Sequence, residues 1–173
     1  MDLRSFIEQL DKKRELTRIT KPVSTEYDLA SVIEALGEKP VFFENVKESN
    51  MPIVAGLVSS KDLIARSLGI SKEHLLPKLS KAIEKPVPPQ VAVKGECQEI
   101  VEKDVDLTKL PIMRYTEKDG GKYISSAVSI VKDPELGRNM CFHRLMLLDK
   151  NHFAPRIVED RGTDLAVIVK ALV

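Results

Sequence analysis

Apolar residues in the first half of the chain recur with the period of an amphipathic helix. The first stripe consists of Leu3, Phe6, Ile7 and Leu10, which follow the i, i+3, i+4, i+7 rule. Serine or threonine residues that can cap a helix, and glycines that can end one, predict two further helices, over 24–37 and over 59–69. Another helix is expected to begin at Ser71, with a kink or boundary at Pro77. Short β-like runs fall at 40–45 and 52–58. This alternation of helices and strands predicts an α/β layer.

The second half of the chain favours β-strands. Short strands are expected at 91–93 and 99–101, and longer ones at 123–131, 140–148 and 152–158. The segments between the longer runs carry Asp, Pro, Gly and Asn, which are turn residues. The three longer runs therefore predict an antiparallel meander. We expect an N-terminal α/β domain over 1–105 and a β-rich domain over 106–173.

The last residues return to helical spacing. Within 163–173 the apolar positions are Leu165, Ile168, Val169 and Leu172, and no Gly, Asn or Pro follows them. A meander that stands alone also exposes two open edges. We therefore expect either that the polypeptide is a fragment or that a partner completes the sheet.

Composition narrows the classes of function. The 173 residues include 27 Lys and Arg and 26 Asp and Glu, a formal net charge of +1, which argues against a dedicated nucleic-acid binder. Five Phe, three Tyr and no Trp disfavour a base-stacking surface. No apolar run approaches the ~20 residues that span a bilayer, and no signal-peptide pattern opens the chain. We expect a cytoplasmic protein with neither nucleic-acid nor membrane partners.

Few residues carry candidate chemistry, and each also has an ordinary structural interpretation. Gly120 and Gly121 precede a strand, where they could let the backbone approach a ligand closely or form a common loop. Asn139 could be a metal or hydrogen-bonding ligand, or a turn residue. His143 and Arg144 lie in an apolar strand. The guanidinium there needs a partner, a phosphate or solvent, and an outward-facing polar pair is the alternative.

A second basic cluster follows one strand later. Arg156 and Arg161, together with Gly162, could hold a phosphate bidentately or form solvated surface. Two neighbouring strands that carry arginine, a glycine-rich entry and an asparagine together indicate a β-barrel wall that holds an anionic cofactor.

Several segments of the chain share the pattern of a known family. In the second half these are DGGKYI at 119–124, KDPELGRN at 132–139, FHR at 142–144 and LDKN at 148–151. In the first half they are LRSF at 3–6, ELTRI at 15–19 and KPVFFEN at 39–45, with DVDL at 104–107 ahead of Leu110 and Pro111. The set resembles the UbiD-like decarboxylase family. The resemblance implies that the chain corresponds to the family's N-terminal domain and the start of its cofactor-binding domain, an antiparallel split β-barrel.

This resemblance implies reversible, non-oxidative decarboxylation of an unsaturated or aromatic carboxylic acid with prenylated FMN. It also implies Mn²⁺ or another divalent metal at the cofactor phosphate, K⁺, a homo-oligomer, and a flavin prenyltransferase that supplies the cofactor. The FHR motif at 142–144 is similar to the archaeal branch, which decarboxylates trans-anhydromevalonate 5-phosphate in a modified mevalonate pathway of isoprenoid biosynthesis. Aromatic acids of the 4-hydroxybenzoate type are the alternative substrate class.

The resemblance also implies roles for individual residues. Asn139 falls on the family's metal ligand. Arg144 falls on the arginine near the flavin and is the candidate catalytic residue, able to hold a carboxylate or to stabilise developing charge. Some members carry a metal-ligating His where this chain has Asp160. The expected cofactor-binding residues are Phe142, His143, Arg144, Arg156, Ile157, Val158, Arg161 and Gly162.

Strand geometry sets a condition on this site. Side chains alternate along a strand, so Asn139 and Arg144 point to opposite faces of a regular one. Both serve one site only if Asn139 precedes the strand or a bulge intervenes.

Two other functions remain open, a non-catalytic flavin-binding or assembly module and a flavin reductase-like binding domain. We also expect that this chain alone does not decarboxylate a substrate, because no acidic proton donor can be assigned in it.

Overall fold

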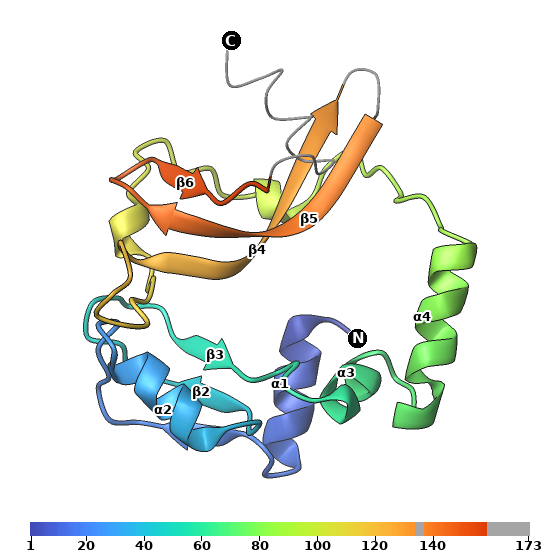
Figure 1. Ribbon diagram of the computed structural model, residues 1–173, viewed down its shortest axis with the longest axis horizontal. Helices are drawn as coiled ribbons and strands as arrows, with labels where there is room; N and C mark the ends of the chain where they lie inside the picture. The colour runs from blue at the N-terminus through green and yellow to red at the C-terminus, as the bar shows by residue number, and fades with distance from the viewer. Residues whose placement is uncertain (134–136, 159–173) are drawn as a thin grey trace. The chain divides into compact units, whose positions relative to one another are not determined.

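The computed structural model describes residues 1–133 and 137–158, which fold into two compact units (Figure 1). The first unit contains Met1–Val23 and Ser31–Asp104. The second contains Ser24–Ala30 and the described residues from Val105 onward. The main division therefore lies one residue before the expected domain boundary, whereas no sequence pattern indicated that the segment 24–30 belongs with the second half of the chain.

Four α-helices and three short strands occur before residue 85. The helices are α1 (Leu3–Lys12), α2 (Asp28–Leu36), α3 (Lys61–Ser67) and α4 (Leu75–Glu84), and the strands are β1 (Thr17–Ile19), β2 (Val41–Phe43) and β3 (Ile53–Ala55). Strand β2 is central, parallel to β1 and antiparallel to β3. Of the two serines that could cap the expected helix over 59–69, Ser59 and Ser60, it is Ser60 that caps α3, since its side chain accepts a hydrogen bond from the amide of Leu63 at 3.3 Å.

The core of the first unit lies under the apolar stripe of α1. Phe6 and Leu10 pack there with Leu16 and Leu63, and Val41 and Phe43 of β2 are inaccessible to solvent. Gly56 lies between this sheet and α3 at φ +74, and a Cβ at this position would come within 2.9 Å of the Lys39 carbonyl oxygen. Only glycine fits such a turn without displacing the neighbouring backbone.

The short strands expected at 91–93 and 99–101 are wrong. The structure gives no regular strand there; only the 3₁₀ turn η2 (Glu96–Gln98) lies between them. The apolar side chains Val91, Val93, Ile100 and Val101 are exposed. β-branched residues favour a strand only where a neighbouring strand pairs with them, and none lies beside this segment in the part of the chain that the structure describes.

The second unit contains the expected antiparallel meander. Its strands are β4 (Tyr123–Asp133), β5 (Gly137–Leu147) and β6 (Phe153–Pro155), in that order across the sheet. The mixed α/β fold with antiparallel strands in the second half is therefore confirmed. The expected turn at 132–137 includes residues 134–136, which lie outside the described residues. The expected helix at 163–173 lies entirely outside them.

The segment 24–30 is bound to the start of this sheet. The Arg114 amide donates to the Thr25 carbonyl at 2.9 Å, and the Tyr27 amide donates to the Arg114 carbonyl at 3.1 Å. Lys122, just before β4, donates to Thr25 Oγ1 at 3.0 Å and pairs with Glu26 at 3.1 Å. Thr25 is 1% exposed, so this polar side chain is buried with its hydrogen bonds satisfied.

No helix within residues 1–133 and 137–158 combines the length and the apolar character needed to cross a membrane.

Candidate functional site

The site begins at a β-bulge in β4. Ile124 pairs with Leu145, and the next pair joins Ala127 to His143. Two residues of β4, Ser125 and Ser126, therefore lie opposite the single residue Arg144 of β5. Such a bulge bends the strand and redirects side chains, and bulges are common beside active sites.

Arg144 has a second arginine directly across the sheet. The β5–β6 register pairs Leu145 with Pro155, and the Arg156 amide continues it by donating to the Arg144 carbonyl at 2.9 Å. Arg144 and Arg156 are thus opposite each other on neighbouring strands. Like charges in this arrangement repel each other and destabilise a sheet, so the pair favours an anionic group between them.

Two adjoining cavities share these arginines. One, of about 410 Å³, is lined by Tyr115, Asp119, Tyr123, Ser125, Arg144 and Arg156. The other, of about 400 Å³, is lined by Ser125, Cys141, Phe142, His143, Arg144, Arg156 and Val158. Each falls within the size range of small-molecule sites. We call them the tyrosine cavity and the Phe142 cavity.

No carboxylate is paired with these two arginines within the described residues. Neither Arg144 nor Arg156 forms an ion pair there. Among the described residues, Asp119 is the one acidic residue that lines either cavity, and its Oδ2 accepts hydrogen bonds from the amides of Thr116 at 2.9 Å and Tyr115 at 3.1 Å. These amide donors, Thr116 foremost, hold the pKa of Asp119 below its ordinary value. Asp119 is therefore ionised at neutral pH and cannot donate a proton.

The glycine pair before β4, Gly120 and Gly121, lies close to the side chain of Met146 on β5. A Cβ on Gly121 would lie 3.2 Å from Cγ of Met146, and one on Gly120 would lie 3.6 Å from its sulfur. The packing of Met146 on β5 thus accounts for a small residue at 121 without a ligand, whereas at 120 a Cβ would make only an ordinary contact.

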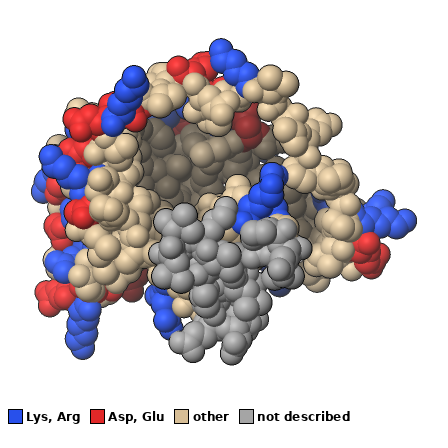
Figure 2. Space-filling model, turned by 90° about the horizontal axis from the view of Figure 1, so that it is seen from above, with Lys and Arg blue, Asp and Glu red and all other residues tan. Residues whose placement is uncertain are grey.

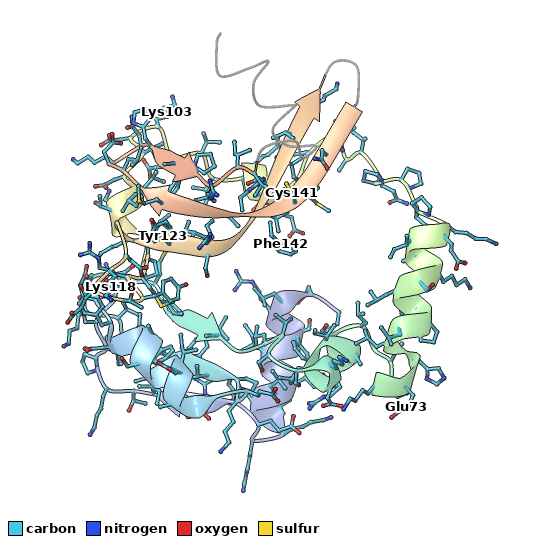
Figure 3. The ribbon with its side chains drawn as sticks, viewed as in Figure 1. Glu73, Lys103, Lys118, Tyr123, Cys141 and Phe142 are labelled. Carbon is cyan, nitrogen blue, oxygen red and sulfur yellow. The ribbon has the colours of Figure 1, made fainter. Side chains whose placement is uncertain are left out.

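His143 fixes the backbone of the second arginine. Its Nδ1 lies 3.0 Å from the Arg156 carbonyl oxygen, and its Nε2 lies 2.9 Å from Sγ of Cys141. A carbonyl oxygen only accepts, so Nδ1 carries the hydrogen that it donates to Arg156. The imidazole therefore helps to hold Arg156 beside β5. In Figure 3, Cys141 and Phe142 leave opposite sides of β5, as strand alternation requires.

Asn139 does not share a face with Arg144. Strand β5 runs unbroken from Gly137 to Leu147 with alternating exposure, and the bulge lies in β4 instead. Asn139 thus lies on the face of Cys141 and His143, and its Oδ1 accepts from the Met140 amide at 2.9 Å. Asn139 lines neither cavity, although Cys141 and His143 of the same face line the Phe142 cavity beside Arg144.

The described residues do not complete a metal site. Within 1–133 and 137–158, no group of three or more His, Cys, Asp or Glu side chains is placed to hold a metal ion. Asn139 alone would be a weak site, because hard divalent cations take several oxygen ligands, usually with carboxylates among them. Asp160, Arg161 and Gly162 lie outside the described residues.

The structure groups most of the other expected residues and adds some. Phe142, His143, Arg144, Arg156 and Val158 line the Phe142 cavity. Ile157, next to two of them, is half-buried and lines neither cavity. Tyr115, Tyr123 and Ser125 were missed by sequence reasoning. Only the resemblance of DGGKYI at 119–124 pointed near them, and nothing in the sequence reveals a bulge at Ser125.

Elsewhere the surface charge is mixed. On the face that Figure 2 shows, Lys and Arg side chains lie among Asp and Glu side chains, mainly near the outer edge, and much of the surface between them is uncharged. This mixture of both signs is in keeping with the formal net charge of +1.

Comparison with known proteins identifies relatives of the chain. Residues 7–83 match the 3-octaprenyl-4-hydroxybenzoate carboxy-lyase N-terminal domain, and residues 90–170 match the Rift-related domain of the same carboxy-lyase. Anhydromevalonate phosphate decarboxylases of Methanothermobacter thermautotrophicus and Methanosarcina mazei are 30% and 37% identical to the chain over 96% and 95% of its length.

The fold agrees as well. An evolved dimeric form of the UbiD-class enzyme HmfF from Pelotomaculum thermopropionicum, solved in complex with prFMN, superposes with a TM-score of 0.89 at 29% identity over 98% of the chain. The chain covers 41% of that structure, and 41% and 38% of the two decarboxylases. It thus spans about two-fifths of the length of these relatives. Two consecutive domain matches and this superposition agree on one conclusion: the chain belongs to the UbiD family.

Proposed function

We propose that the chain is the N-terminal part of a non-oxidative decarboxylase that binds prenylated FMN at Arg144 and Arg156. The observation that carries the proposal is the cross-strand arginine pair, which lines two adjoining cavities and has no carboxylate partner among the described residues. An anionic cofactor relieves the repulsion between the two guanidinium groups. The complex of a related UbiD-class enzyme with prFMN supports the same assignment.

The residues of the site have separable tasks in this reaction. Decarboxylation breaks a C–C bond, releases CO₂ and leaves a carbanion, for which prenylated FMN supplies the electron sink when bound. Arg144 orients the departing carboxylate through charge-assisted hydrogen bonds. Arg156, whose backbone His143 holds, binds the anionic part of the cofactor. A proton must then replace CO₂, and Asp119, held ionised by its own loop, does not supply it.

We propose trans-anhydromevalonate 5-phosphate as the substrate, supported by the two archaeal relatives. Aromatic acids are the second candidate, favoured by the two phenol rings of Tyr115 and Tyr123 in one cavity. Mn²⁺ and K⁺ remain predictions from the sequence, and the proposed chemistry assigns no step to them. A homo-oligomer, a flavin prenyltransferase as the source of cofactor and a cytoplasmic location complete the proposal.

Complementation tests this function. The chain is loaded with prenylated FMN, Mn²⁺ and K⁺, and CO₂ release is measured from anhydromevalonate phosphate and from aromatic and α,β-unsaturated acids. We expect flavin binding without CO₂ release, and release once the C-terminal part of the Methanosarcina mazei relative is added as a separate polypeptide. The Arg144→Gln chain in the same mixture is the control and should stay inactive. Failure of the unsubstituted chain to bind the flavin would contradict the proposal.

A further inference from the structure

The tyrosine cavity contains a pair of hydroxyl groups beside Arg144. The phenol oxygen of Tyr115 lies 2.8 Å from Oγ of Ser125. Ser125 stands in the bulge of β4, opposite Arg144, and both hydroxyl residues line this cavity together with Arg144 and Arg156. The bulge thus brings a hydroxyl pair and two guanidinium groups to one pocket.

The hydroxyl pair has one hydrogen left to donate. Two hydroxyl groups carry two protons, and their mutual hydrogen bond uses one of them. No other hydrogen bond of either side chain occurs within the described part of the chain. The remaining O–H therefore suits an acceptor in the cavity, and a negatively charged oxygen is the acceptor that binds it most strongly.

The two cavities differ in the residues that they do not share. Phe142, His143 and Val158, which the resemblance implies for the cofactor, line only the Phe142 cavity. Tyr115 and Tyr123 line only the other. A flavin seated against the first group leaves the tyrosine cavity open to a second molecule, with Arg144 between the two.

We infer that the Tyr115–Ser125 hydroxyl pair binds the carboxylate of the acid substrate, donating to one oxygen while Arg144 binds the other. The inference rests on the proposed function, because it needs the flavin in the Phe142 cavity. Its content is narrower: Tyr115, which lines only the tyrosine cavity, and Ser125, which lines both cavities, bind the substrate and contribute little to the affinity for the cofactor.

The test separates the two ligands by titration. FMN binding is followed by flavin fluorescence. The FMN-loaded chain is then titrated with trans-2-hexenoate, with trans-2-hexen-1-ol as the neutral match, and with inorganic phosphate. The variants are Tyr115→Phe and Ser125→Ala, which each remove one hydroxyl, and Ser125→Thr, which keeps it. Tyr27→Phe is the matched control, because Tyr27 is the one tyrosine that lines neither cavity.

We expect Tyr115→Phe and Ser125→Ala to weaken hexenoate binding by ~10- to 100-fold, the value of about one hydrogen bond to a charged group. Their FMN affinity should stay within about twofold of the unsubstituted chain, and neither should change the weak binding of the alcohol. Ser125→Thr and Tyr27→Phe should bind hexenoate normally. Thermal melting of each variant establishes that it is folded. Because Ser125→Thr changes the side chain but keeps the hydroxyl, normal hexenoate binding by this variant would attribute the loss in Ser125→Ala to the hydroxyl.

Several outcomes would overturn the inference. Unchanged hexenoate binding in both hydroxyl deletions, or no hexenoate binding by the FMN-loaded chain, removes the pair from the substrate site. A parallel loss of FMN or phosphate binding assigns the pair to the cofactor phosphate instead. These results differ from a failure of the proposed function, in which the unsubstituted chain does not bind FMN at all.

Discussion

Arginines in the two units of this protein have opposite surroundings. In the first unit, Arg18 binds Asp11 at 2.7 Å and Glu44 at 2.8 Å and lies over the ring of Phe42. Arg66 in the same unit pairs with Glu15 and with Asp62. In the second unit, Arg144 and Arg156 face each other across two strands with no carboxylate bound to either among the described residues.

The difference separates a structural use of arginine from a binding use. Carboxylates satisfy the donors of Arg18 and Arg66 and join segments that are distant in sequence. Arg144 and Arg156 instead lie opposite each other with like charges, which repel, and in the proposed function a bound anion relieves this repulsion. A total count of charged residues cannot reveal this, because the two kinds of arginine contribute equally to the net charge.

The largest effect is expected from the unpaired arginines. Arg144→Gln and Arg156→Gln should each weaken FMN binding by ~10- to 100-fold, since each removes a charge-assisted hydrogen bond. The melting temperature should stay the same or rise, because one of two like charges is gone. Flavin fluorescence titration and thermal melting measure both. Arg138→Gln is the matched control, since Arg138 is exposed on the same face of β5 and lines neither cavity. A clear fall in melting temperature would show that the pair stabilises the sheet.

A smaller and opposite effect is expected at Arg66. Its side chain is 24% exposed and has two carboxylate partners, so Arg66→Gln should lower the free energy of unfolding by about 1 kcal/mol. Urea denaturation measures the loss, and FMN affinity should not change. Arg4→Gln, at an exposed arginine for which no ion pair occurs among the described residues, should leave both quantities unaltered. A change in the FMN affinity of Arg66→Gln would contradict the distinction between structural arginines and ligand-binding arginines.

The smallest effect concerns Asp119. Amide hydrogen bonds, that of Thr116 first, lower its pKa in the folded chain from the ordinary value of 3.8. The ionised carboxylate therefore stabilises the fold above pH 3.8, and this contribution is lost as the pH falls through the lowered pKa. Asp119→Asn should melt slightly below the unsubstituted chain at neutral pH, with the gap closing below pH 3.8. A gap that stays constant down to pH 2 would refute the role of the charge.

Helices and long strands could be predicted from the sequence because local spacing determines them. The stripe of Leu3, Phe6 and Leu10 and the cap at Ser60 are properties of neighbouring residues. The alternation in 123–158 is likewise local, and β4, β5 and β6 follow it. Prediction failed at 91–101, where β-branched residues have no strand beside them to pair with, since pairing depends on the whole fold.

The candidate site was predicted only in part, for the same physical reason. Arg144 and Arg156 were recognised as a basic pair on adjacent strands, and the register of β5 and β6 joins them. Tyr115 and Ser125 were missed, because their contact depends on a bulge that no local pattern encodes. The face of the sheet on which Asn139 lies depends on whether β5 continues through residue 139. The residues at 137–147 form that continuous strand only when β4 pairs with them, so the face could not be predicted from local sequence.

The segment 24–30 bears on how this protein can be divided and how it folds. Lys122 reaches back 97 positions to bind Thr25, so a single cut between residues 104 and 105 would strip the second unit of a buried threonine and the β-bridge to Arg114. Closing so long a loop costs entropy before the contact forms, which slows folding. During synthesis, the residues around Thr25 emerge early and must wait for Arg114 and Lys122. The two halves are thus sequential on the chain but interdependent in assembly, and a single crossover at the linker would separate Thr25 from Arg114 and Lys122.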